Sequence, residues 1–301
     1  MSSNVESIAN KVLGERTGEV KTYSPDILVP VPRNLSIEYL GVKMEDLPGN
    51  GFDVWYSYEF RTLTKNGLPV ASAIKFVIPH DSKNIIESKS FKLYCNGFTT
   101  ERLGETKQEA LEKACEIMKK DLSKAAEGDV QVSVVDGKLK FPIFSVYKDL
   151  TEFVDPKITV DEYYENPKLL EVNSTEKVME HRFKFDALRS KCRVTGQPDS
   201  GTIYLYYKSK KLITPESLVR YFSSFYEECH FHEEILITAF ERISKLIDAD
   251  DELMICALYQ RRGSLDIGPI RFINMNISEN PEIYNFWSPK VFAFDPNNLY
   301  R

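Results

Sequence analysis

The sequence predicts an α+β protein built from two modules, each with its helices on one face of an antiparallel sheet. Strand-forming and helix-forming stretches follow the same order in both halves, which is a degenerate internal repeat. The length of 301 residues suits two domains, and an acidic, proline-containing stretch near residues 145–170 is the expected connection. We therefore expect one module over residues 1–150 and a second over residues 151–301.

The first half begins with a lead-in over residues 1–50, rich in Pro, Gly and Asn, that we expect to be loosely structured. Phe52–Phe60 is aromatic and β-branched, which is typical of a strand. The turn signal Asn66-Gly67 and a second strand-like run, Val70–Ile78, follow it. Together these two runs predict a β-hairpin.

A helix is predicted after Thr106, because Thr106 and Glu109 have the spacing of a capping box. Apolar residues then recur at helical spacing until about Gly128. Val130–Val135 and Lys138–Phe144 return to strand-like composition. This half therefore reads as strands, a helical segment and strands.

The second half repeats this order. Thr214-Pro215 marks a helix start, with an N-cap residue followed by proline at the first helical position. Leu218, Tyr221, Phe222 and Phe225 then form an apolar stripe. The other elements predicted here are strands at Lys177–Phe185, Gly201–Lys208 and Leu253–Leu258, and a helix from Ile235 to Leu246.

Composition excludes several classes of protein. The net charge of −6 argues against a protein that mainly grips a nucleic-acid backbone. Five scattered cysteines without a CxxC pair fit free thiols in a reducing compartment. With no signal-peptide pattern and no apolar stretch of about 20 residues, we expect a cytoplasmic protein without a membrane partner.

The loop Lys191–Gly201 carries the first candidate for chemistry, since Cys192 lies between Lys191 and Arg193, with Asp199 seven residues further on. A thiol beside cations on a loop before a strand is a plausible nucleophile. Alone the signal is weak, because most cysteines are small buried hydrophobes. Cys229–His232 has no standard zinc spacing, so no metal site is predicted.

Three further stretches each allow a functional and a structural interpretation. His232-Glu233 offers a proton shuttle and a hydrogen-bond acceptor, or simply a helix N-terminus with favourable acids. Glu87–Lys92 and Arg261–Gly263 offer hydroxyls and cations for phosphates, or solvated element ends. The chain contains no GxGxxG, no P-loop and no GxSxG motif.

Taken together, these motifs resemble the NADPH-dependent 7-cyano-7-deazaguanine reductases, the QueF-type nitrile reductases of queuosine biosynthesis, in their two-module form. The resemblance rests on Glu87–Tyr94, on Cys192 with Gln197-Pro198-Asp199, on Phe231–Glu233 and on Arg261–Asp266, in the family's order. Departures are small: Ser264 stands where a second glycine is common, and Gly196 and Ser200 replace bulkier residues.

The resemblance implies tandem tunnelling-fold modules of ββααββ order, assembled as a homodimer. It implies that Cys192 attacks the nitrile of 7-cyano-7-deazaguanine to form a covalent thioimide. Two NADPH molecules then reduce the thioimide to 7-aminomethyl-7-deazaguanine, for tRNA modification. Asp199 would serve as the proton donor and His232 would assist proton transfer, without direct nucleic-acid contact.

Further roles follow from the same resemblance. The implied substrate-binding residues are Ile86, Glu87, Ser88, His232 and Glu233. The implied NADPH-binding residues are Ser88, Lys89, Arg262 and Gly263. Our own inference is that Lys191 and Arg193 favour the thiolate of Cys192.

Two other functions stay open at this point. An amidinotransferase of the archaeal type uses the same thioimide but captures ammonia on a tRNA-borne base. A non-catalytic deazapurine-binding protein would bind the ligand without a covalent bond. The Glu87–Tyr94 motif and the acidic charge balance weigh against the amidinotransferase.

Overall fold

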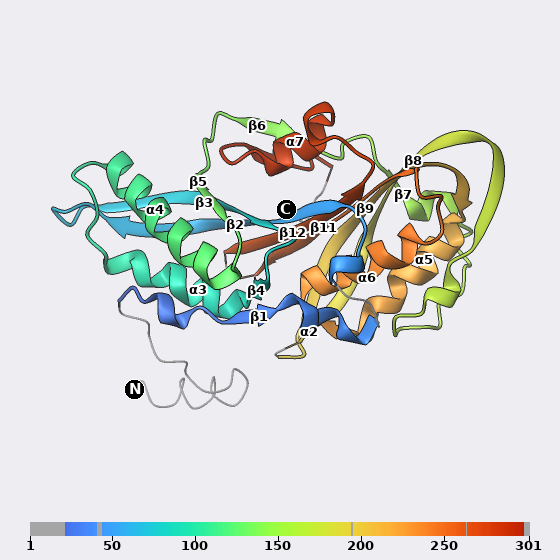
Figure 1. Cartoon of the computed structure of the whole chain (residues 1–301), viewed down its shortest axis with the longest axis horizontal. Helices are drawn as coiled ribbons and strands as arrows, with labels where there is room; N and C mark the ends of the chain where they lie inside the picture. Colours follow the sequence, from blue (N-terminus) through green and yellow to red (C-terminus); the bar gives the residue numbers. More distant parts are fainter. Residues whose placement is uncertain (1–21, 41–43, 194, 263, 298–301) are drawn as a thin grey trace.

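The computed structural model describes residues 22–40, 44–193, 195–262 and 264–297 of the chain. This part of the chain forms one long, mostly antiparallel sheet with helices packed on it (Figure 1). Along the sheet the strands follow the order β10-β8-β9-β11-β12-β2-β3-β5, and β7 pairs with β8. The predicted α+β class, with antiparallel pairing, is confirmed.

The element bounds match the sequence pattern closely in the first half and less closely in the second. The long strands are β2 Asn50–Leu63, β3 Pro69–Pro79, β8 Val172–Cys192, β9 Pro198–Ile213, β11 Glu252–Arg262 and β12 Leu265–Ile273. The short strands are β1 Pro30–Pro32, β4 Asn84–Ile86, β5 Gln131–Val134, β6 Lys140–Pro142, β7 Lys148–Asp149, β10 Cys229–His230 and β13 Phe292–Phe294. The helices are α2 Arg33–Ile37, α3 Ser88–Gly97, α4 Lys107–Ala126, α5 Pro215–Ser223, α6 His232–Ser244 and α7 Pro281–Trp287.

The two halves of the chain meet at the pair β12–β2. Their antiparallel register runs from Leu265 opposite Ser57 to Phe272 opposite Asn50. The backbone hydrogen bonds therefore continue from the strands of one half into those of the other. No local sequence signal marks this seam, because both partners are ordinary strands that lie about 200 residues apart.

Strands β8 and β9 extend further than the sequence indicated. Lys191 pairs with Pro198, so Cys192 ends β8 and only a short turn separates it from β9. The expected loop Lys191–Gly201 is thus mostly strand. Gly196 has a φ of 65° in this turn, a left-handed conformation that glycine adopts without steric cost.

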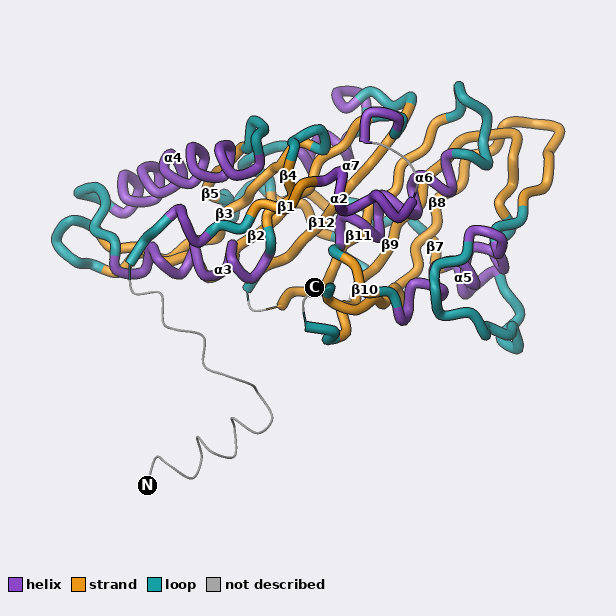
Figure 2. Tube along the Cα trace, turned by 60° about the horizontal axis from the view of Figure 1, so that its bottom comes forward, coloured by secondary structure: helices purple, strands orange, loops and turns teal. Residues whose placement is uncertain are grey.

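Helices α3 and α4 of the first half and α5 and α6 of the second cover the same face of the sheet (Figure 2). The N-cap of α4 is Thr106, whose hydroxyl accepts from Glu109 N at 3.2 Å. The Glu109 carboxylate accepts from Glu105 N at 2.9 Å rather than from Thr106, which modifies the expected capping box. The apolar stripe of α5 is buried, each such side chain contributing about 1.5–3 kcal/mol.

The opposite face of the sheet is covered by the C-terminal segment, for which the sequence supported no prediction. Ile283 and Phe286 of α7 pack with Val54 and Tyr56, which point away from α3 and α4. Strand β13 pairs with β6 beside them. The expectation that helices lie on one face therefore holds for α3 to α6 but not for α7.

The lead-in is more ordered than its composition suggested. Strand β1 pairs with β4, and α2 follows it at once. The Arg33 guanidinium is buried and lies 2.7 Å from the Asp53 carboxylate. Tertiary contacts, which the Pro- and Gly-rich composition does not reveal, thus order residues 22–40. Among the described residues, no helix has the length and apolar character needed to span a membrane.

Candidate active site

A cavity of about 280 Å³ lies on the helix-covered face, where the two halves of the chain meet. Its walls come from the helices α3 and α6 and from the strands β2, β4, β8, β9, β10, β11 and β12. Among the residues predicted from the sequence, it brings together Ile86, Ser88, Lys89, Cys192, Asp199, His232 and Glu233. A second recess of about 470 Å³ near Leu47–Gly49 contains none of these residues.

Cys192 is positioned by the end of β8. Its N–H donates to Gln197 O at 2.8 Å, and its carbonyl accepts from Gly196 N at 2.8 Å. Its Cα also pairs with His230 of β10. These backbone contacts hold the thiol at the cavity wall, on a partly exposed residue.

The cation that contacts the thiol comes from the other half of the chain. Lys89 Nζ, on α3, lies 3.3 Å from Cys192 Sγ. The neighbours in sequence are engaged elsewhere, since Lys191 pairs with Glu227 and Arg193 pairs with Glu234. From the sequence we inferred that Lys191 and Arg193 favour the thiolate. In the structure the cation in contact with the sulfur is Lys89 instead. A nearby ammonium group stabilises a thiolate over a thiol.

Asp199 and His232 form a pair on the cavity wall. His232 Nε2 lies 3.4 Å from Asp199 Oδ2. The imidazole ring stacks on Tyr259 with 3.8 Å between ring centroids and an angle of 8°. The carboxylate and the stacked ring therefore have restricted orientations, as a proton-transfer pair requires.

Glu233 is buried in the cavity wall with an exposure of 2%. Within the described part of the chain, its Oε1 has no hydrogen-bond partner, and the same holds for Trp55 Nε1. Burial, followed by the charge of Asp53, raises the pKa of Glu233 to about 8. Because buried polar groups are nearly always hydrogen-bonded, an acceptor and a donor left open at one cavity indicate a polar ligand.

Glu87 has a different environment from the one that its predicted role suggests. It is the N-cap of α3, and its carboxylate accepts from Lys89 N at 3.0 Å and from Ser90 N at 2.7 Å. It does not belong to the residues that line the cavity, whereas its neighbours Ile86 and Ser88 do. In this structure Glu87 thus fixes the start of the helix that carries Lys89.

The predicted Arg261–Gly263 motif is only partly visible. Strand β11 ends at Arg262, but the side chains of Arg261 and Arg262 and all of Gly263 lie outside the described residues. Ser264, which stands where the family often has glycine, has a φ of 75°. This left-handed conformation costs a non-glycine residue about 1 kcal/mol, which accounts for the glycine preference.

The cavity also contains residues outside the predicted set of site residues. Lys92, which the sequence already offered as a cation for phosphates within Glu87–Lys92, lies one helical turn after Lys89. Phe231 and Leu265 lie in motifs that carried the resemblance, although no role was assigned to them. The others are Trp55, His230, Gln260 and Ile267, which reach the cavity through strand pairing or beside α6.

The fold and the site define a thiol-containing enzyme pocket in an α+β protein. Residues 20–134 match the family described as "Nitrile reductase, 7-cyano-7-deazaguanine-reductase N-term", and residues 198–275 match the family described as "QueF-like protein". The chain is 37% identical over 268 residues to the NADPH-dependent 7-cyano-7-deazaguanine reductase of Coxiella burnetii strain Dugway 5J108-111. That match covers 88% of this chain and 92% of the relative, and the proteins of strains CbuK_Q154 and RSA 331 match to the same extent. The chain belongs to the 7-cyano-7-deazaguanine reductase family.

Proposed function

We propose that this protein is an NADPH-dependent oxidoreductase that reduces the nitrile of 7-cyano-7-deazaguanine to 7-aminomethyl-7-deazaguanine. One observation carries the proposal: a cavity between the two halves holds a thiol, an ammonium group, an Asp–His pair and a buried glutamate. Each matches a requirement of nitrile reduction. The family membership and the names of the relatives agree with it.

Cys192 is the nucleophile in this proposal. An ordinary thiol has a pKa of about 8.5 and is mostly protonated at neutral pH, so Lys89 beside the sulfur supports the reactive thiolate. Asp199 takes the thiol proton. The sulfur bonds to the nitrile carbon, one π pair of the triple bond moves to nitrogen, and the protonated Asp199 gives that nitrogen its proton. The product of this step is a covalent thioimide.

Reduction to the amine requires four electrons, which NADPH supplies as two hydride equivalents when it is bound. The Cys192 sulfur leaves with the electron pair of the C–S bond, which regenerates the thiolate. His232, in contact with Asp199, delivers protons to the substrate nitrogen. The stack of His232 on Tyr259 keeps the ring in place through both reductions.

Recognition of the deazaguanine is assigned to Glu233, with Ile86 and Ser88 beside it. A carboxylate accepts hydrogen bonds, and the guanine-type edge offers adjacent N–H donors. Glu87 remains a predicted substrate-binding residue. Its carboxylate caps α3 with some of its lone pairs, and the others can accept hydrogen bonds from the substrate. His232 faces the same cavity and completes the set.

The residues at the cavity rim fit NADPH chemically. The Ser88 hydroxyl and the Lys89 and Lys92 ammonium groups lie on α3 at the cavity, and such groups bind phosphate oxygens. Arg262 and Gly263 remain predicted contacts of the same cofactor. The position of Lys89, near the thiol and among these groups, supports a cofactor site on the same wall as the nucleophile.

The larger architecture is proposed on the same basis. The tunnelling fold with modules over residues 1–150 and 151–301 is supported by the repeated order of strands and helices and by separate apolar cores under α3–α4 and α5–α6. The continuous seam between β12 and β2 makes the modules one structural unit. Homodimer assembly, a cytoplasmic location and use of the amine in tRNA modification stay predictions.

An absorbance assay tests this function. The purified chain with 7-cyano-7-deazaguanine should oxidise two NADPH per substrate, and Cys192→Ala should abolish the oxidation. Adduct formation without NADPH oxidation would contradict the reductase and support an amidinotransferase. Tight binding with neither adduct nor oxidation would support a non-catalytic deazapurine-binding protein.

A further inference from the structure

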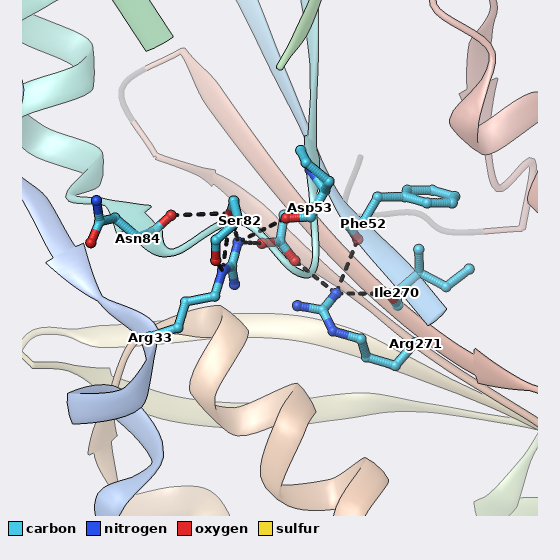
Figure 3. A network of polar contacts seen from close by, with 8 residues as sticks. Arg33, Phe52, Asp53, Ser82, Asn84, Ile270 and Arg271 are labelled. Carbon is cyan, nitrogen blue, oxygen red and sulfur yellow. Dashed lines mark hydrogen bonds and ion pairs between the residues drawn. The ribbon is translucent and has the colours of Figure 1, made fainter. Parts of the chain in front are cut away.

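Three buried charged side chains meet near the start of α6 and are not among the predicted site residues. Arg33 Nη2 lies 2.7 Å from Asp53 Oδ2, and Arg271 Nη1 lies 2.9 Å from Asp53 Oδ1. Figure 3 shows the two guanidinium groups on either side of the Asp53 carboxylate. We call these residues the Arg33–Asp53–Arg271 cluster. Each has an exposure of 4% or less.

The cluster is held rigidly by the elements that meet at the seam. Arg33 Nε, on α2, donates to Ser82 O at 3.0 Å, and Arg271 Nη1, on β12, donates to Ile270 O at 2.8 Å. Asp53 belongs to β2, the partner strand of β12. Burial alone would raise the pKa of Asp53, but the two guanidinium groups hold it below its ordinary value. The cluster is therefore two cations and one anion, with a net charge of +1.

Glu233 interacts electrostatically with all three members of this cluster. Burial is the main cause that raises its pKa, Asp53 raises it further, and Arg33 and Arg271 oppose both effects. Tyr259 of β11 also faces Glu233. His80 faces the cluster, and burial lowers its pKa to about 4, so it is neutral near pH 7.

Glu233 also lacks the contacts that a buried carboxylate needs. Its Oε1 has no hydrogen-bond partner among the described residues, and neither has Arg271 Nη2. A buried ionised carboxylate is costly unless it is paired and hydrogen-bonded. The net positive charge of the cluster offsets part of the cost of ionising Glu233 from a distance. The missing hydrogen bonds have to come from a ligand in the cavity.

We propose that the Arg33–Asp53–Arg271 cluster is a positioning device that lets Glu233 ionise when a ligand with a guanine-type edge binds. The inference rests on the proposed function and deepens it. The ligand's N–H donors and the cluster's net charge together stabilise the carboxylate, which releases its proton on binding. A ligand that presents a hydrogen-bond acceptor at this position does not stabilise the ionised carboxylate. Glu233 then stays protonated, and the charge of the cluster adds nothing to binding. The cluster thus contributes to selection of the deazaguanine.

Calorimetry measures the proton directly. The Cys192→Ala chain, which cannot form the thioimide, is titrated with 7-cyano-7-deazaguanine at pH 7 in two buffers of different ionisation enthalpy. We expect close to one proton released per ligand, and affinity about tenfold weaker at pH 6 than at pH 7, because only the ionised fraction binds well. Glu233→Gln in the same background should abolish the proton release and flatten the pH profile.

Substitutions at Arg271 test the role of the cluster. Arg271→Met removes one positive charge, so affinity at pH 7 should fall at least tenfold and recover largely at pH 8.5. Arg271→Lys keeps the charge and should stay within threefold of the parent. Lys75→Met is the matched control, because Lys75 is a buried lysine that donates to Ser288 O at 2.7 Å, away from the cluster. It should lower stability without changing proton release.

The outcomes separate the two claims. No binding by the Cys192→Ala chain and no turnover by the unchanged chain would overturn the proposed function and this inference together. Binding with equal proton release before and after Glu233→Gln would overturn the inference alone. An Arg271→Met chain that binds with unchanged affinity and pH profile would do the same. If Arg271→Met does not fold, the affinity of Arg271→Lys and the number of protons released with and without the Glu233 carboxylate still test the inference.

Discussion

Glu233 and Glu234 are consecutive, buried glutamates at the start of α6, yet their carboxylates have different surroundings. Glu234 accepts from Arg193 Nη1 at 2.5 Å and from Phe231 N at 2.8 Å, and lies 3.2 Å from His230 Nδ1. Glu233 has one oxygen without any partner in the described part of the chain and faces the cavity. A fully satisfied buried acid indicates a structural role, and an incompletely satisfied one indicates a ligand.

The surroundings of Glu234 explain how the two segments that carry Cys192 and His232 are joined. Arg193 directly follows Cys192, and Phe231 directly precedes His232. A carboxylate bonded to both therefore connects the end of β8 to the start of α6. Burial alone would lower the pKa of His230, but Glu228 and Glu234 together raise it to about 9, so His230 adds a positive charge to this connection.

The largest effect is expected from Glu233→Gln. The substitution keeps the shape but removes the carboxylate that accepts the ligand's N–H groups, so kcat/KM should fall about 100-fold or more. The free energy of unfolding should stay within about 1 kcal/mol, because no internal hydrogen bond depends on the open oxygen. Steady-state kinetics and urea unfolding check both expectations, and activity within threefold of the parent would refute the assignment.

Glu234→Ala should show the opposite pattern. It leaves Arg193, His230 and the Phe231 N–H without their acceptor and should lower the free energy of unfolding by about 2–3 kcal/mol. Water offsets part of the loss, because the Arg193 side chain is 44% exposed. At a temperature where the variant stays folded, kcat/KM should fall less than tenfold. A loss of activity as large as that of Glu233→Gln would remove the contrast between the two residues.

Stability should also depend on the protonation of His230. Its pKa is raised in the folded protein, so its contribution is fully present below pH 6.5 and is lost as the pH rises towards 9. We expect a loss of about 2 kcal/mol across this window. Urea unfolding from pH 6 to pH 9.5 measures it, with His230→Gln as the control. The same slope in the control would assign the pH dependence to other groups.

The smallest effect is expected on the reactivity of Cys192, when Lys89, its neighbour in space, is compared with Lys191, its neighbour in sequence. Lys89→Met should slow alkylation of Cys192 by iodoacetamide at pH 7 by up to about tenfold, since it removes the ammonium group beside the sulfur. Lys191→Met should leave the rate within twofold, because Lys191 is paired with Glu227. Equal effects of both substitutions would mean that the contact with Lys89 does not influence the thiol.

Sequence reasoning located much of the site because its motifs are local. Cys192 with Asp199, and His232 with Glu233, lie within short stretches whose residue types already suggest chemistry, and the cavity unites them. The fold class and the starts of α4 and α5 were also predictable, since caps and apolar periodicity are local signals.

The part of the site that could not be predicted depends on contacts between the two halves of the chain. Neither the contact of Lys89 with Cys192 nor the contact of Arg271 with Asp53 can be read from local patterns, because each joins residues of the two halves of the chain. The same limit explains the lead-in. Arg33 lies in a Pro-rich stretch without periodicity, and its buried partner Asp53 and the pairing of β1 with β4 show why the stretch is ordered.

Intact-protein mass tests the central claim, the covalent role of Cys192, most directly. The chain incubated with 7-cyano-7-deazaguanine and without NADPH should gain the mass of one substrate molecule. Cys192→Ala should gain nothing, and Asp199→Asn should gain it far more slowly while keeping its fold. An unmodified mass for the unchanged chain, in the presence of demonstrated binding, would contradict the thioimide and with it this account of the site.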